Sequence, residues 1–195
     1  VKDPDAKASD LNVARQFLKD NGSDAKVVAK IEDQSGIENL NEIIEVSDAL
    51  MVARGDLGVE IPIAKVPVVQ KELIRAANQK ARLVITATQM LESMINTPQP
   101  NRAEVSDVAN AVMDAVDAVM LSGETAVGEY PVQTCQVMHD IIDQTEEEMF
   151  KAHWRLRPNV ERRGRDQAGV GMAVANSAVF ASGAAQSTRC SEAKW

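Results

Sequence analysis

The chain is poor in the residue types that build zinc sites, disulfide frameworks and aromatic surfaces on which bases stack. Its 195 residues include two cysteines, Cys135 and Cys190, and two histidines, with no CxxC pair or Cys/His cluster. A zinc site or a disulfide framework is therefore not expected, and a reducing, cytoplasmic location fits best. Aromatic side chains make up only 3% of the residues, which argues against nucleic-acid binding through stacked bases.

The sequence also lacks an excess of positive charge and any long apolar run. Lys and Arg number 21 against 29 Asp and Glu, a formal net charge of -8. That balance argues against a general polyanion binder, whereas a small phosphorylated substrate fits if a metal neutralises its charge. No stretch approaches the length of a membrane span and no signal-peptide pattern is present, so we expect no membrane partner. The sequence begins with Val, and we interpret it as a piece of a longer chain.

Four short apolar runs indicate the fold class. They cover residues 26–31, 48–53, 83–88 and 117–122, are rich in Val, Ile, Leu and Met, and do not alternate with polar residues. Runs of this kind are typical of buried parallel strands.

Helical periodicity lies between and after these runs. The pattern covers residues 38–46, 69–80, 101–116 and 132–151, and Asn101 with Glu104 has the spacing of a capping box. Strands alternating with helices predict an α/β fold with a parallel sheet, either doubly wound or part of a (β/α)₈ barrel. No GxGxxG turn follows a strand, which favours the barrel.

Polar and charged residues stand at the end of each apolar run. Ligands gather at the carboxyl ends of parallel strands, so these residues are site candidates. The four ends supply Lys30 and Glu32; Arg54, Gly55 and Asp56; Thr86, Thr88 and Gln89; and Ser122, Gly123, Glu124 and Thr125.

Two carboxylates on neighbouring strands, Glu32 and Asp56, suit a hard divalent cation such as Mg²⁺. We interpret residues 54–58 as a glycine-containing turn whose amides can face an anion. Simpler interpretations stay open at this point. Lys30 and Glu32 can form a surface ion pair, Arg54 can be a structural ion-pair former, and the glycines can be ordinary turn residues.

Several ordered stretches of the sequence resemble the pyruvate kinase family. They read AKIED, SDALMVARGDLGVEIP, TATQMLESM and PQPNRAEVSDVANAVMDAVDAVMLSGETAVGEYP. The catalytic domain of that family is a (β/α)₈ barrel. The resemblance implies that residues 1–136 form a partial barrel, strands five to eight with their helices. Residues 137–195 would then be a linker helix and the truncated, helical start of a C-terminal α/β domain.

The resemblance also implies an activity, the glycolytic transfer of a phosphoryl group between phosphoenolpyruvate and ADP to give pyruvate and ATP. Glu32 and Asp56 would hold Mg²⁺ or Mn²⁺. The amides around Gly55 and Asp56, together with Thr88, would bind the substrate. Lys30 would neutralise charge on the transferring phosphoryl group and the enolate oxygen, and Thr88 would lie near the proton-delivery path to C3 of the enolate.

Further expectations follow from the same resemblance. Ser122 and Glu124 match a motif that faces the same cavity, and Arg54 is a further site candidate. K⁺ is expected, but the family's K⁺ ligands have no counterpart in this sequence. The intact protein is expected to be a homotetramer, with Arg102 reaching toward a neighbouring subunit.

Two other interpretations compete with this one. The first is another Mg²⁺-dependent barrel enzyme acting on pyruvate-like substrates, such as a class II aldolase relative, which should lack the TATQMLESM and SGETAVGEYP segments. The second is a non-catalytic, truncated half-barrel. Four strands of a barrel leave two free sheet edges, and upstream phosphate-binding groups are missing, so we expect the chain by itself not to be an active kinase.

Overall fold

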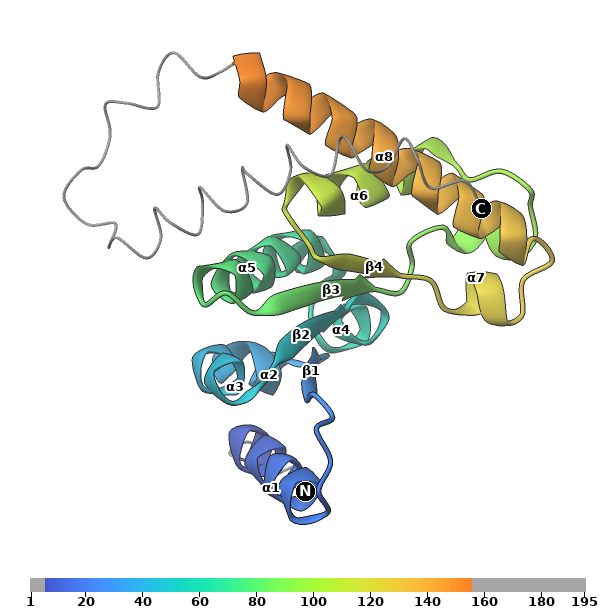
Figure 1. Cartoon of the computed structure of the whole chain (residues 1–195). Coiled ribbons are helices and arrows are strands. Elements are labelled where there is room, and N and C mark those ends of the chain that lie inside the picture. The colour runs from blue at the N-terminus through green and yellow to red at the C-terminus, as the bar shows by residue number, and fades with distance from the viewer. Residues whose placement is uncertain (1–5, 156–195) are drawn as a thin grey trace. The chain divides into compact units, whose positions relative to one another are not determined.

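The computed structural model describes residues 6–155 (Figure 1). The chain divides into two compact units, Val1–Phe150 and Lys151–Trp195, and the description below concerns the first unit and the end of its last helix. Its elements in chain order are α1 (Ala6–Asp20), β1 (Val28–Ile31), α2 (Gln34–Glu38), α3 (Leu40–Val46), β2 (Ala49–Ala53), α4 (Arg54–Glu60), the 3₁₀ helix η1 (Ile63–Lys65), α5 (Val66–Gln79), β3 (Leu83–Ala87), η2 (Glu92–Ile95), α6 (Arg102–Met113), β4 (Ala118–Met120), α7 (Gly123–Ala126) and α8 (Pro131–Arg155).

The four strands form one parallel sheet in the order β1-β2-β3-β4, which confirms the predicted α/β class (Figure 1). An aspartate directly before a strand links two of the strand pairs. The Asp48 carboxylate accepts a hydrogen bond from the Val27 amide at 2.8 Å, and the Asp117 carboxylate accepts one from the Val84 amide at 2.8 Å. Each aspartate therefore ties the start of its own strand to the neighbouring strand.

One face of the sheet packs against helices α3 and α5. Leu50, Val52 and Val84 are completely buried on this face, in a cluster with Leu73 and Ile74 of α5. Side chains alternate between the faces of a strand, so the residues next to these point the other way.

The opposite face carries apolar side chains that remain accessible to solvent. Val28 of β1 and Leu83 of β3 are 43% and 58% exposed, and both are in register with Ala49 of β2. The described sheet thus has one helix-covered face and one face that carries exposed apolar side chains together with Lys30.

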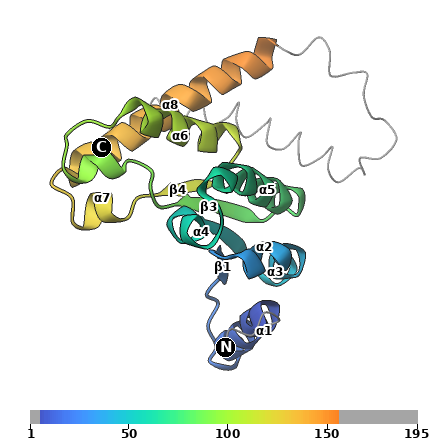
Figure 2. The ribbon, with the colours of Figure 1, turned by 180° about the vertical axis from the view of Figure 1, so that it is seen from behind.

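A second apolar cluster lies around α6 and α8, which run beside each other in both views (Figures 1 and 2). Met94, Val108 and Met138 are its buried members from η2, α6 and α8. At the start of α6 the predicted capping box is confirmed: Asn101 accepts from the Glu104 amide, and Glu104 accepts from the Asn101 amide, both at 3.0 Å.

One local prediction was wrong, and another was confirmed over a shorter range. Residues 54–58 are not a turn, because α4 begins at Arg54 directly after β2. The helix predicted over residues 38–46 is observed as α3, which begins at Leu40 and buries Ile43 and Ile44. A separate helix, α2, precedes it with Asp33 as its N-cap, accepting from the Gly36 amide at 2.8 Å.

The predicted domain boundary between residues 136 and 137 lies inside the continuous helix α8 and stays a prediction. Most of the expected C-terminal segment, residues 156–195, lies outside the described residues. No helix within residues 6–155 is both long and apolar enough to cross a membrane.

Candidate active site

Three charged side chains meet beyond the carboxyl ends of β1 and β2. The Lys30 ammonium lies 2.6 Å from the Glu32 carboxylate and 2.7 Å from the Asp56 carboxylate. The three side chains are about half exposed, at 49%, 42% and 54%. Hydrogen bonds to Asp56 and then to Glu32 hold the pKa of Lys30 above its ordinary value, so its amine is charged at neutral pH.

The local fold explains why these groups converge. Lys30 pairs with Met51 across β1 and β2, so the two strands end side by side. Because α4 begins at Arg54, its first turn brings Asp56 over the end of β1 rather than away from it. The same edge holds an acidic pocket of about 210 Å³ lined by Glu32, Asp33, Asp56, Val59 and Glu60.

The acidic pocket is not a closed metal centre. No group of three or more His, Cys, Asp or Glu side chains in the described part of the chain has the arrangement to hold a metal ion. Two carboxylates do converge on one cation, the Lys30 ammonium. Mg²⁺ is commonly held by one or two carboxylates together with substrate oxygens and water, and Glu32 and Asp56 fit that pattern.

Gly55 and Thr88 make the next contact of the site. The Gly55 amide donates to the Thr88 hydroxyl at 2.8 Å, and this hydroxyl donates to the Ala87 carbonyl at 2.7 Å. A Cβ atom at position 55 would lie 3.3 Å from Thr88 Oγ1, so a glycine is what allows this close approach. The substrate-binding candidates Gly55 and Thr88 are thus adjacent in space although they are 33 residues apart.

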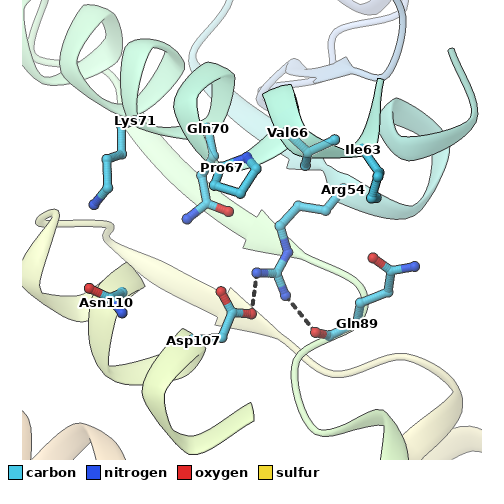
Figure 3. A pocket seen from close by; sticks show the side chains of 9 residues that line it. All are labelled: Arg54, Ile63, Val66, Pro67, Gln70, Lys71, Gln89, Asp107 and Asn110. Carbon is cyan, nitrogen blue, oxygen red and sulfur yellow. Dashed lines mark hydrogen bonds and ion pairs between the residues drawn. The ribbon is translucent and has the colours of Figure 1, made fainter. Parts of the chain in front are cut away.

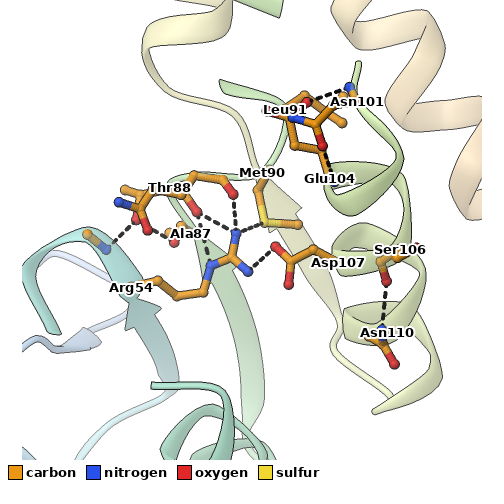
Figure 4. Close-up of polar contacts among 12 residues, drawn as sticks. Arg54, Ala87, Thr88, Met90, Leu91, Asn101, Glu104, Ser106, Asp107 and Asn110 are labelled. Atoms are coloured by element: carbon orange, nitrogen blue, oxygen red, sulfur yellow. Dashed lines mark hydrogen bonds and ion pairs between the residues drawn. The ribbon is translucent and has the colours of Figure 1, made fainter. Parts of the chain in front are cut away.

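Thr88 and Gln89 have left-handed backbone conformations, with φ of 66° and 53°. Such conformations are costly for residues other than glycine and persist where surrounding contacts hold them. Arg54 provides those contacts (Figure 4). Its Nη2 donates to the carbonyl oxygens of Thr88 at 2.6 Å and Gln89 at 2.7 Å, and its Nε donates to Thr88 at 3.0 Å.

Arg54 is therefore placed as a structural clamp. Its side chain is only 7% exposed and pairs with Asp107 of α6 through Nη1 (Figures 3 and 4). With donors already committed to two carbonyls and a carboxylate, the guanidinium stabilises the turn after β3. The sequence left open whether Arg54 is a structural ion-pair former, and this is the role that its contacts give it in the structure.

Glu124 and Ser122 are also engaged with the backbone. Glu124 is 2% exposed, and its carboxylate accepts from the amides of Leu91 at 3.3 Å and Ser122 at 2.8 Å. These bonds connect the segment after β4 to the segment after β3. The structure does not direct this carboxylate to the Lys30 cluster.

A larger pocket lies beside the Arg54 side chain. It measures about 350 Å³ and is lined by residues of α5 and α6 together with Arg54, Ile63 of η1 and Gln89 (Figure 3). None of Lys30, Glu32 and Asp56 lines it. The pocket therefore borders the Arg54 side chain and not the cluster of Lys30, Glu32 and Asp56.

Sequence reasoning included one wrong candidate and missed one important residue. Thr86 lies in register with Val52 on the helix-covered face of the sheet and is completely buried, so it does not join the site. Asp107 was missed because nothing local distinguishes it from the other carboxylates on an amphipathic helix; only its contact with Arg54, 53 residues away, reveals it.

Comparison with known proteins adds an independent finding. The family model described as pyruvate kinase, barrel domain, matches residues 5–135. A pyruvate kinase of Bacillus licheniformis is 57% identical over 140 residues, covering 71% of this chain and 24% of the relative. One of Sporosarcina psychrophila is 50% identical over 174 residues, covering 89% of this chain and 30% of the relative.

A solved structure agrees with the sequence matches. The crystal structure of a pyruvate kinase from Cryptosporidium parvum matches with a TM-score of 0.71 and 47% identity, covering 72% of this chain and 30% of that one. The chain thus spans about a quarter to a third of the length of the relatives described here. With the barrel-domain model matching two thirds of its residues, the chain belongs to the pyruvate kinase family.

Proposed function

We propose that this chain supplies the metal and phosphoryl-transfer part of a pyruvate kinase active site, in which phosphoenolpyruvate and ADP give pyruvate and ATP. The observation that carries the proposal is the convergence of Glu32 and Asp56 on Lys30 beyond two adjacent parallel strands. Phosphoryl transfer depends on positioning and charge neutralisation more than on covalent chemistry, and this cluster offers both.

Glu32 and Asp56 would hold Mg²⁺ or Mn²⁺, which supplies Lewis-acid neutralisation of the phosphoryl oxygens when bound. Both carboxylates are about half exposed, so they can exchange the ammonium for another cation without uncovering a buried charge. Lys30, released from its ion pairs and still protonated, would then face the transferring phosphoryl group and the enolate oxygen.

The substrate carboxylate would lie at the start of α4. The Gly55 amide donates to the Thr88 hydroxyl and that hydroxyl donates to the Ala87 carbonyl, so a bound carboxylate would take these two neighbouring donors in exchange for their present acceptors. The amide of Asp56 follows in the same helical turn, where backbone amides favour a negative charge. Thr88 would also lie beside C3 of the enolate, on the path that delivers the proton.

The finer fold assignment belongs to the same proposal. The four strands would be strands five to eight of a (β/α)₈ barrel, with β1 and β4 at the edges of the described sheet. Two features support it: the sequential parallel order, and the exposed Val28 and Leu83 on the face without helices. In a closed barrel these side chains would point into its interior.

The remaining parts of the activity would come from outside this segment. ADP and ATP would be the nucleotide partners, K⁺ would be bound by residues beyond this sequence, and the intact protein would be a cytoplasmic homotetramer with Arg102 at a subunit contact. We expect no kinase turnover from the 195-residue chain alone, since several charge-stabilising groups would be missing together.

Calorimetric titration of Mg²⁺ into the chain, with oxalate present as a pyruvate-like anion, tests the metal assignment. Glu32→Gln and Asp56→Asn should each weaken binding by about tenfold or more, because each removes one charged ligand. Glu42→Gln, an exposed carboxylate on α3, is the matched control and should bind as the unaltered chain does. Equal binding by all three variants would contradict the site assignment.

A further inference from the structure

The contact between Arg54 and Asp107 connects α6 to the candidate substrate-binding turn. Arg54 uses Nη1 for the Asp107 carboxylate, and Nε and Nη2 for the carbonyls of Thr88 and Gln89 (Figure 4). A guanidinium is a rigid planar fork. Holding Nη1 against Asp107 therefore fixes the direction in which Nε and Nη2 donate.

The two residues that Arg54 holds are the left-handed pair Thr88 and Gln89. Their conformation needs continued support from neighbouring groups. The Thr88 hydroxyl in turn accepts from the Gly55 amide. A chain of contacts therefore runs from Asp107 through Arg54 to the turn, and from the turn to the amide at the start of α4.

We infer that Asp107 is a positioning residue for the active site: through Arg54 it holds the Thr88–Gln89 turn, and with it the Thr88 hydroxyl, against the Gly55 amide. Asp107 lines the 350 Å³ pocket and not the acidic one, so its role is to orient other groups and not to touch substrate. Only the link to catalysis rests on the proposed function, because the positioning is a property of the folded chain.

A second anchor on α6 makes this role separable from general packing. Glu104 accepts from the Ser93 amide at 2.7 Å and also from the Ser93 hydroxyl. The capping box and the buried Val108 hold the helix as well. Loss of the Asp107 charge should therefore free Arg54 without undocking α6.

The test compares Asp107→Asn with Asp114→Asn in the 195-residue chain. Asp114 is a matched control because it is the C-cap residue of the same helix and forms an ion pair with Lys71, outside this chain of contacts. The readouts are hydrogen exchange of the Gly55 amide and the backbone ¹³C shifts of Thr88 and Gln89, followed by NMR.

Asp107→Asn should accelerate Gly55 exchange by about tenfold and shift the Thr88 and Gln89 signals, because the amide oxygen of Asn still accepts from Arg54 but no longer carries the charge that strengthens this hydrogen bond. Asp107→Glu, which keeps the charge, should restore most of the protection, and Asp114→Asn should leave Gly55 unchanged. The inference is overturned if Gly55 keeps its protection in Asp107→Asn or loses it equally in Asp114→Asn. It is also overturned if Asp107→Asn unfolds the chain, since Asp107 would then support the whole fold.

A binding measurement separates this inference from the proposed function. With Mg²⁺ saturating, oxalate should bind Asp107→Asn about tenfold more weakly, whereas Mg²⁺ alone should bind it as before. Failure of the unaltered chain to bind Mg²⁺ and oxalate would contradict the proposed function, while Gly55 exchange would still decide the positioning role. Unchanged oxalate affinity together with altered Gly55 exchange would overturn the link between Asp107 and substrate binding.

Discussion

Replacing Arg54 with Met should destabilise the fold far more than a typical ion-pair deletion. Met keeps an apolar stem of similar length but removes the donors to the Thr88 and Gln89 carbonyls and the partner of Asp107. Breaking a buried pair costs about 3–5 kcal/mol, and the lower end applies because the Asp107 side chain is 39% exposed and can regain water. We therefore expect a loss of about 3 kcal/mol in the free energy of unfolding.

Lys71→Met provides the matched comparison. Lys71 pairs with Asp114 at 2.6 Å, but its side chain is 41% exposed, so the loss should be about 1 kcal/mol or less. For a unit of about 150 residues each kcal/mol corresponds to roughly 2–4 °C in Tm. Arg54→Met should thus lower Tm by about 6–12 °C in calorimetry, clearly more than Lys71→Met. Equal shifts for the two variants would refute the view that Arg54 is an energetically important clamp.

Three further outcomes are expected from the structure. Gly128→Ala should cost about 1–3 kcal/mol in thermal denaturation, because its Cβ would lie 2.3 Å from the Glu124 carbonyl oxygen; unchanged stability would show that the backbone yields there easily. The hydrogen bond from the Val27 amide lowers the pKa of Asp48, so the ionised carboxylate stabilises the folded chain at pH values above its ordinary pKa. This contribution should be lost as the pH falls through the lowered pKa, and Asp48→Asn should lose less stability over the same pH range. A pH titration of Tm checks this, and equal acid sensitivity in both proteins would count against it. Because its pKa is raised, Lys30 should be acylated at pH 8 more slowly than other exposed lysines, as peptide mass spectrometry can measure; faster labelling would contradict the ion-pair geometry.

The sheet could be predicted from the sequence because its signals are local. Runs of Val, Ile, Leu and Met mark four strands, and each observed strand lies within a predicted run. The capping box at Asn101 and Glu104 was equally predictable, since both partners lie within one turn. The placement of Lys30 and Glu32 at one edge followed from the two-residue period of a strand.

The start of α4 could not be predicted in the same way. Two glycines in five residues, Gly55 and Gly58, lower helix propensity and favour a turn. The helix forms because tertiary contacts hold its first turn: Arg54 is fixed by carbonyls 34 and 35 residues away, and the Gly55 amide is bonded to Thr88. Contacts at that separation leave no local pattern in the sequence.

Exposure separates the charges that can bind a ligand from those that stabilise the structure. The sequence placed Lys30, Glu32, Arg54, Asp56 and Glu124 together at strand ends without ranking them. Arg54 and Glu124 are at most 7% exposed, and their polar atoms are bonded to backbone groups and to one carboxylate. A charge so deeply buried must keep its partners, because losing them leaves it neither solvated nor paired.

The other three charges are in a different position. Lys30, Glu32 and Asp56 are 42–54% exposed, and Lys30 pairs with both carboxylates beyond the ends of β1 and β2. Water already screens these pairs, so exchanging one cation for another at the carboxylates costs little. The proposed function, in which Glu32 and Asp56 exchange Lys30 for a metal ion, requires charges of this kind. The pair of the buried Arg54 with Asp107 has a different effect: it fixes the position of the Thr88 and Gln89 backbone.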